Sequence, residues 1–95
     1  MAVNRGELVT TGEDVLLVIS GGMFNLMPDE ISVIAVPIIE DSHGSLTVQI
    51  GQHGFAVPGW VTSVPKAAIR TAVGRASTQE LSDVNNMLFR ILATD

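Results

Sequence analysis

The sequence predicts a single, mainly β (α+β) domain of about five strands, with a short helix and a C-terminal amphipathic helix. Two observations carry this prediction. Short β-branched runs separated by glycine and proline turns occupy most of the chain, and one helical stripe of apolar residues ends it. Ninety-five residues suffice for only one core, because two smaller units would each bury too little surface to offset chain entropy. We therefore assign residues 1–95 to one domain.

The chain begins with two predicted strands joined by a tight turn. Residues 6–10 (GELVT) form the first strand, and Thr11-Gly12 supplies the turn. Residues 14–20 (DVLLVIS) form an almost continuous apolar run, which is typical of a strand covered on both faces. Gly21-Gly22 ends that strand.

A loop over residues 23–30 leads to the next strand, residues 31–39 (ISVIAVPII). Pro37 has no N–H to donate, so it marks an end, a bulge or an edge of this strand. Residues 41–44 (DSHG) form a hairpin turn, because Asp, Ser and Gly suit tight turns.

Two further strands and a short helix follow. Residues 45–50 (SLTVQI) alternate, which predicts a half-exposed strand. One of its faces carries Leu46, Val48 and Ile50. Residues 59–63 (GWVTS) are another strand. Pro65 begins the short helix PKAAIR, since proline is tolerated at the first helical position, and Gly74 stops that element.

The last element is a helix with a clear start. Ser77 and Glu80 form a capping box, in which each side chain accepts a backbone N–H of the other residue. The spacing of the apolar residues that follow predicts one core-facing stripe. This stripe consists of Leu81, Val84, Leu88, Ile91 and Leu92, and the opposite face carries Asp83, Asn86 and Arg90.

Charge and composition narrow the function classes. The net charge of −5 argues against a general phosphate-binding surface, although Lys66, Arg70, Arg75 and Arg90 all lie in the second half of the chain. The chain has no cysteine, shows no signal peptide, and has no apolar run long enough to cross a bilayer. We expect a soluble cytoplasmic protein with no membrane contact. His43 and His53 lack a third ligand nearby, so we expect no metal and no cofactor.

Several segments resemble the toxins of the MazF, Kid and CcdB fold, which belong to bacterial type II toxin–antitoxin pairs. The likeness spans about residues 5–93, and its pieces occur in the family's order. These pieces are Arg5-Gly6-Glu7-Leu8, Leu16-Leu17-Val18-Ile19-Ser20, Phe24-Asn25, Val33-Ile34-Ala35-Val36-Pro37-Ile38, Val64-Pro65-Lys66-Ala67-Ala68-Ile69, and Arg75-Ala76-Ser77 with Glu80-Leu81.

The resemblance implies a small SH3-like barrel and a homodimeric endoribonuclease. Such an enzyme cleaves single-stranded RNA at a short sequence, without metal, and a cognate antitoxin holds it inactive. In the family an arginine before the second strand and a threonine or serine after the proline strand carry the cleavage. Those positions read Asp14 and Ile39 in this chain, so neither catalytic role carries over.

We therefore predict a displaced active site. His43 and Asp41, close to the position of the family's threonine, are the candidate pair for proton transfer. Lys66 and Arg70, four residues apart on the predicted helix, are candidates to hold a phosphate, and Thr62 adds a hydroxyl contact. The alternative for each is an ordinary exposed polar side chain. Arg75 is expected to bond the carbonyls that end the preceding helical turn.

Four apolar residues are candidates for a partner interface. Trp60 either stacks on a base or anchors a protein contact. Met23, Phe24 and Met27 make the loop after the second strand unusually apolar, so it is either a lid on the core or an interface. Glu13 and Asp14 are interpreted as a solvated turn, with a basic antitoxin segment or a general-base role as the other readings.

Two other classes remain open. One is a non-enzymatic toxin or antitoxin-binding module on the same fold, either gyrase-poison-like or catalytically silent. The chain ends Ile91-Leu92-Ala93-Thr94-Asp95, which lacks the tryptophan–glycine–isoleucine ending of the gyrase poisons. The other is an unrelated SH3-like adaptor.

Overall fold

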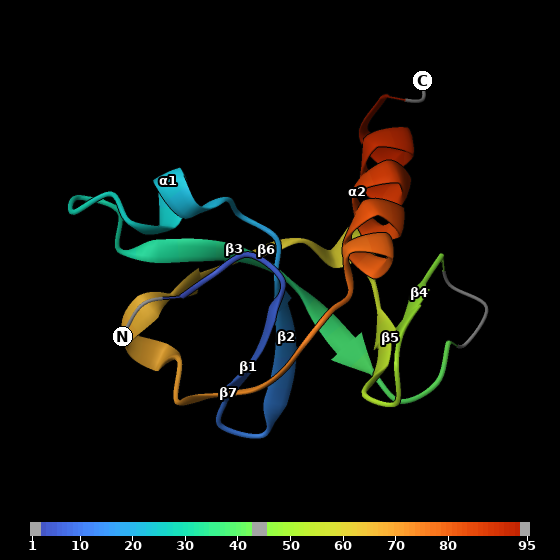
Figure 1. Cartoon of the computed structure of the whole chain (residues 1–95), viewed down its shortest axis with the longest axis horizontal. Coiled ribbons are helices and arrows are strands. Elements are labelled where there is room, and N and C mark those ends of the chain that lie inside the picture. The colour runs from blue at the N-terminus through green and yellow to red at the C-terminus, as the bar shows by residue number, and fades with distance from the viewer. Residues whose placement is uncertain (1–2, 43–45, 94–95) are drawn as a thin grey trace.

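The computed structural model describes residues 3–42 and 46–93. A mostly antiparallel sheet curls into a half-barrel, with one long helix beside it (Figure 1). The strands are β1 Glu7–Thr11, β2 Asp14–Val18, β3 Ser32–Ile39, β4 Val48–Ile50, β5 Gly54–Ala56, β6 Thr62–Pro65 and β7 Thr71–Arg75. The helices are α1 Gly22–Asn25 and α2 Thr78–Ala93, with the 3₁₀ turns η1 Pro58–Trp60 and η2 Lys66–Ala68. The predicted α+β class is confirmed.

β3 is the central strand, and it changes partner along its length. One edge pairs with β2, while the other edge pairs first with β6 and then with β5. Pro37 lies between the two partners, because β6 pairing ends at Ala35 and β5 pairing begins at Ile38. The Ile19 N–H donates to the Ile34 carbonyl, so the two-residue alternation makes Leu16–Pro37 a non-hydrogen-bonded pair. The missing N–H of Pro37 therefore costs no ladder bond to β2, and on the other edge the Pro37 carbonyl accepts the Val57 N–H at 3.1 Å.

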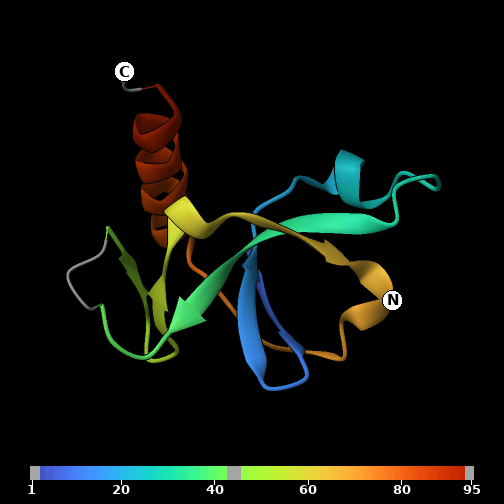
Figure 2. The ribbon, with the colours of Figure 1, turned by 180° about the vertical axis from the view of Figure 1, so that it is seen from behind.

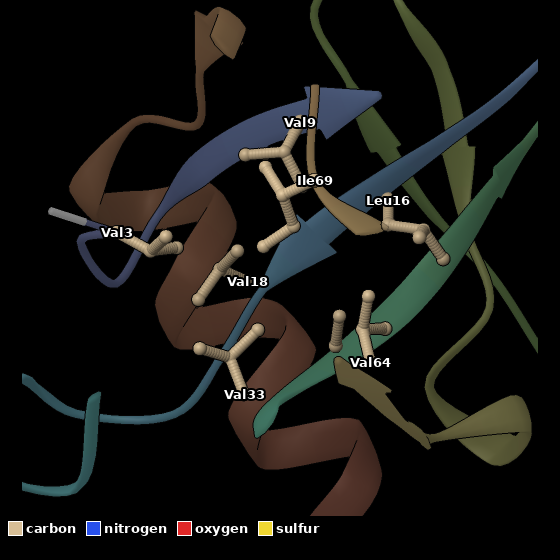
Figure 3. Packing of buried hydrophobic residues seen from close by; sticks show 8 residues of the cluster. Val3, Val9, Leu16, Val18, Val33, Val64 and Ile69 are labelled. Carbon is tan, nitrogen blue, oxygen red and sulfur yellow. The ribbon is translucent and has the colours of Figure 1, made fainter. Parts of the chain in front are cut away.

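The sheet buries side chains on both of its faces. One core faces away from α2 and is closed over by Val64 and Ile69 (Figure 3). The other joins the sheet to α2 and to the β4–β5 pair, and Val84 is its fully buried residue from the helix. Leu16, Leu17 and Val18 are all buried, because neighbours along a strand point into opposite cores. This confirms the prediction of a strand covered on both faces.

α2 starts at the predicted capping box. The Ser77 N–H donates to Glu80 Oε1 at 2.8 Å, and the Glu80 N–H donates to Ser77 Oγ at 3.1 Å. Glu80 Oε2 also accepts the Gly51 N–H at 2.8 Å, which ties the helix start to the β4–β5 turn. The Ser77 N–H is the main cause of the lowered pKa of Glu80. The Gly51 N–H, the Ser77 hydroxyl and the charge of His53 act the same way against the opposing effect of burial.

The far half of α2 extends past the sheet, as both ribbon views show (Figures 1 and 2). Leu81 and Val84 pack in the core, but Leu92 is 74% exposed and Phe89 is equally open. The predicted stripe is thus buried only at its start. Its end is an apolar surface that the described residues leave uncovered.

Three predicted elements were wrong in the first two thirds of the chain. The 23–30 loop contains the one-turn helix α1, whose Asn25 N–H donates to the Gly21 carbonyl. β3 and β4 do not pair as a hairpin would require, because β5 lies between them in the sheet, and residues 43 and 44 of the predicted turn lie outside the described residues. β4 begins only at Val48, so Leu46 lies outside it and is 64% exposed.

The later elements also differ from the prediction. The 59–63 strand is replaced by η1 and β6, so Trp60 ends a 3₁₀ turn. The short helix is reduced to η2, and the next residues form β7 along the edge of β1. Gly74 lies inside β7, where a Cβ would be 2.7 Å from the His53 ring. Arg75 donates from Nη2 to the Arg5 carbonyl at 3.3 Å and not to a helical turn.

Replacing Gly6 with alanine tests how closely α2 approaches the sheet. Gly6 has φ +93°, and a Cβ there would lie 2.9 Å from Leu81 Cδ1. Gly12 is the matched control, because its φ is +83° and a Cβ would meet no atom within 4 Å. Both substitutions strain the backbone, but only Gly6→Ala overpacks the core, which costs roughly 1 kcal/mol more. Urea unfolding measures both, and equal losses would contradict this packing.

Glu80→Gln tests the capping box through pH. Because the pKa of Glu80 is lowered on folding, its stabilisation is present above its usual value of 4.5 and is lost as pH falls through the folded value. We expect Glu80→Gln to lower the unfolding free energy at pH 7 by on the order of 1 kcal/mol, kept small by solvent. The difference from wild type should shrink below pH 4.5. Glu13→Gln, in an exposed turn, is the control, and a pH-independent difference would refute the assignment.

Candidate functional site

The predicted proton-transfer pair is only partly placed. Asp41 is exposed just beyond the end of β3, whereas His43 lies outside the described residues. Ile39 is the last residue of β3, pairs with Phe55 of β5 and is half-buried. An isoleucine in this position has no group for acid–base work, so any proton transfer here falls to the segment that follows β3.

The acidic pair lies in the turn between β1 and β2. Glu13 and Asp14 are both exposed, and Asp14 is the first residue of β2, opposite Thr11. Both carboxylates therefore stay in water, which is the simplest of the three readings of this pair. Their position leaves the end of the β1–β2 hairpin negatively charged.

Arg70 lies at the same end of the sheet. Its N–H donates to the Thr10 carbonyl at 2.8 Å, one residue before Thr11, the partner of Asp14. Its side chain is exposed. Arg70 thus lies two strands away from Asp14, the position at which the resembling family has its arginine. At about 4.8 Å per strand, this is a separation of roughly 10 Å between backbones.

Lys66 and Arg70 do not share a helix face, contrary to the prediction. η2 ends at Ala68, and Ile69 turns inward into the core. Lys66 is half-buried, and its N–H donates to the Ile31 carbonyl at 2.8 Å. Thr62 is exposed at the start of β6. Thr62, Lys66 and Arg70 thus come from β6, from η2 and from the segment before β7, and no helix holds them on one face.

Lys66 borders an apolar cleft beside α1. This cleft has a volume of about 430 Å³, and Leu26, Met27, Ile31 and Ala67 line it. Met23 is 90% exposed and Met27 is 52% exposed, whereas Phe24 is half-buried. The loop therefore presents its methionines to solvent and is not a lid on the core. An open apolar surface of this kind is typical of a partner contact.

Asn25 fixes this apolar loop, and sequence reasoning missed its role. It is the one buried polar residue within residues 3–42 and 46–93. Its Nδ2 donates to the Val3 carbonyl at 3.1 Å and the Ser20 carbonyl at 2.9 Å, and its Oδ1 accepts the Ser20 hydroxyl. The hydrophilic residue inside "GGMFNLM" was the available signal, since a lone Asn amid apolar neighbours needs buried partners.

Trp60 belongs to a second apolar surface, around the far half of α2. It is 56% exposed at the end of η1, and η1 packs against α2. Ile91 Cδ1 lies 3.7 Å from the position of a Cβ on Gly59. A cleft of about 330 Å³ beside Leu46, Met87 and Ile91 continues this surface. The loop of α1 and this surface lie toward opposite ends of the long axis (Figure 1).

Comparison with solved structures decides the fold. A MazE–MazF complex from Deinococcus radiodurans has a chain that superposes with a TM-score of 0.85 at 20% identity, covering 100% of both chains. The fold is that of MazF. MazF alone from the same organism gives 0.78 at 19% identity over 99% of each chain. A mycobacterial endoribonuclease in complex with its cognate antitoxin gives 0.82 at 17% identity, covering 99% of this chain and 96% of that one. No protein-family model and no curated protein sequence matches the chain.

The MazF-like arrangement carries neither a membrane span nor a metal-binding cluster among residues 3–42 and 46–93. In that part of the chain, no helix has the length and apolarity to cross a bilayer. Nor do three His, Asp or Glu side chains there gather as ligands of an ion would.

Proposed function

We propose that this chain is the toxin of a type II toxin–antitoxin pair, a sequence-specific endoribonuclease that cleaves single-stranded RNA without metal. It works in the cytoplasm as a homodimer, and a cognate antitoxin holds it inactive. The observation that carries the proposal is the match of the whole chain to MazF structures and to an endoribonuclease bound to its antitoxin. The six sequence segments of the resemblance, in the same order, support it independently.

The reaction would be attack of a ribose 2′-hydroxyl on the adjacent phosphate. It needs a base, an acid, and a positive group facing the charge that develops on the phosphorane. Asp14 repels a phosphate, so it does not supply the positive group. We assign this role to Arg70, because it is exposed and its backbone is bonded to β1 at the same end of the sheet. Asp41 and His43 would move the protons, and Lys66 and Thr62 would contact the RNA backbone.

The two apolar surfaces fit the protein contacts that this function requires. A homodimer and an antitoxin complex each need an apolar centre that is desolvated on binding. Met23, Phe24 and Met27 supply one such centre beside α1, and Trp60 with the end of α2 supplies the other. We assign these surfaces to a second copy of the chain and to the antitoxin.

A non-enzymatic toxin or antitoxin-binding module is the second candidate. One specific observation favours it, namely that both positions of the family's catalytic pair hold residues unable to do that chemistry. Asp14 has the wrong charge, and Ile39 is a half-buried apolar residue paired within the sheet. A protein of this kind would bind an antitoxin or another protein target and leave RNA intact.

Induced expression separates these candidates. We expect wild type to stop growth and to fragment cellular RNA, and the antitoxin to reverse both effects. Arg70→Gln and His43→Ala should each slow RNA cutting by at least about tenfold, the range of one general acid–base or charge-stabilising group. Arg90→Gln, which removes the same charge from α2, is the matched control.

Growth arrest with intact RNA would support the non-enzymatic candidate. Full RNA cutting in both Arg70→Gln and His43→Ala would remove these residues from the active site while leaving the enzyme class in place. Folding of each variant is checked by its urea unfolding midpoint, because an exposed Arg70 should change stability by less than about 0.5 kcal/mol.

A further inference from the structure

Two arginines, Arg5 and Arg75, line a cleft between the sheet and α2. The cleft has a volume of about 520 Å³ and is bounded by the start of β1, the end of β7 and the first half of α2. It is lined by Arg5, Arg75, Thr78, Leu81, Ser82, Asn85 and Asn86. Two of the five basic side chains of the protein therefore meet in one place.

Strand pairing brings the two arginines together across seventy residues of sequence. The β1–β7 ladder places Glu7 opposite Arg75, so the chain just before β1 lies beside the end of β7. Arg75 Nη2 donates to the Arg5 carbonyl at 3.3 Å, and the Ala76 N–H donates to the Gly6 carbonyl at 2.8 Å. Both arginine side chains are exposed. These two bonds fix the base of the cleft, and Arg75 uses one N–H of its guanidinium group there while both arginine residues remain exposed.

The helix supplies a polar wall. Thr78, Ser82 and Asn85 are spaced by four and three residues, so they lie on one face of α2, and Asn86 follows. Leu81 belongs to the same face but packs over Gly6, where the missing Cβ leaves room for it. The close approach of Leu81 to Gly6 holds this row of hydroxyl and amide groups beside the arginines.

The acidic neighbour of the cleft is Glu7. Its Oε1 accepts the Asn4 N–H at 2.6 Å, which engages the carboxylate with the turn before β1. Arg75 bonds a carbonyl and not this carboxylate. The cleft therefore keeps a positive balance of charge within a protein whose net charge is −5. Glu7 lowers the affinity for an anion without cancelling the site.

We propose that this cleft binds the phosphodiester backbone of single-stranded RNA. The bound segment of the strand would be one that lies away from the phosphate that is cleaved. The proposal rests on the proposed endoribonuclease function and extends it to a site distinct from the residues near Arg70. Guanidinium groups bind phosphate oxygens through paired N–H bonds, while hydroxyl and amide side chains contact sugars and base edges. An acidic peptide fits less well, because a protein contact needs an apolar centre. Leu81 is the one apolar side chain in the lining, and it already packs against Gly6.

The test is the salt dependence of RNA binding by the purified full chain. The probe is a fluorescent, mixed-sequence single-stranded RNA with 2′-O-methyl ribose, which cannot be cut by attack of the 2′-hydroxyl. Arg5→Gln with Arg75→Gln should weaken binding roughly tenfold at about 50 mM salt. It should also reduce the slope of log K against log salt by about 1.4, at 0.7 for each lost phosphate contact.

Two single variants distinguish a loss of binding from a loss of folding, because one is expected to strengthen binding and the other controls for the loss of a positive charge. Glu7→Gln removes the opposing charge, keeps an oxygen for the Asn4 N–H, and should strengthen RNA binding. Arg90→Gln removes a positive charge from α2 outside the cleft lining and should have the smaller effect. Opposite responses to Glu7→Gln and to the double arginine variant would establish the cleft as the source of the effect.

Three results would overturn the proposal. If wild type binds RNA and the double variant has the same affinity and slope, the cleft is not an RNA site, and the proposed function stands. If the double variant loses its antitoxin but keeps RNA, the ligand is an acidic peptide. If wild type binds none of this probe, the cleft is not an RNA site, and cutting of natural RNA decides the nuclease function separately. RNA binding through the cleft without any cutting of natural RNA would support the cleft alone.

Discussion

The rest of the structure depends on the change of partner along β3. A strand that pairs with β6 at its start and β5 at its end makes two sheets diverge from one edge, which curls the whole layer. Pro37 stands where the change occurs, at a position that needs no ladder bond with β2. Its carbonyl accepts the N–H of Val57, the residue after β5, and it has no N–H to donate at this edge. The proline thus suits the branch point.

The branch has direct consequences for where function can lie. Because β1, β2 and β3 bury side chains in both cores, exposed polar groups lie mainly on the edge strands β6 and β7, in the turns and loops, and on the outside of α2. The β1–β2 turn, Arg70 and the segment after β3 are such ends. α2 covers only one core and covers it only with its first half, so its far half remains apolar and open.

The sequence predicted the elements whose signal is local. β2, β3 and the start of α2 follow from an apolar run, a β-branched run and a capping box, each contained within a few residues. β7 was missed because Thr71, Ala72 and Val73 are exposed and carry no alternation, and their pairing with β1 is set by residues far away in the chain. Lys66 and Arg70 show the same limit, since a single turn of 3₁₀ helix replaced the expected helix.

The candidate site was less predictable than the fold. Arg5 and Arg75 are seventy residues apart, and only the β1–β7 ladder brings them together. Asn25 was visible as an isolated polar residue, but its partners Val3 and Ser20 come from two separate segments. Residue type suggests what a side chain can do, whereas its neighbours depend on pairings that no local pattern encodes.

The most direct test of the proposed nuclease is incubation of the purified protein with a long defined RNA in EDTA, with the new 5′ ends mapped by primer extension. The proposal predicts discrete cuts at one short repeated motif, which would mean that cleavage proceeds with Asp14 in the position of the family's arginine. Intact RNA, under conditions in which a MazF control cuts, would contradict the nuclease function and direct the search to protein targets.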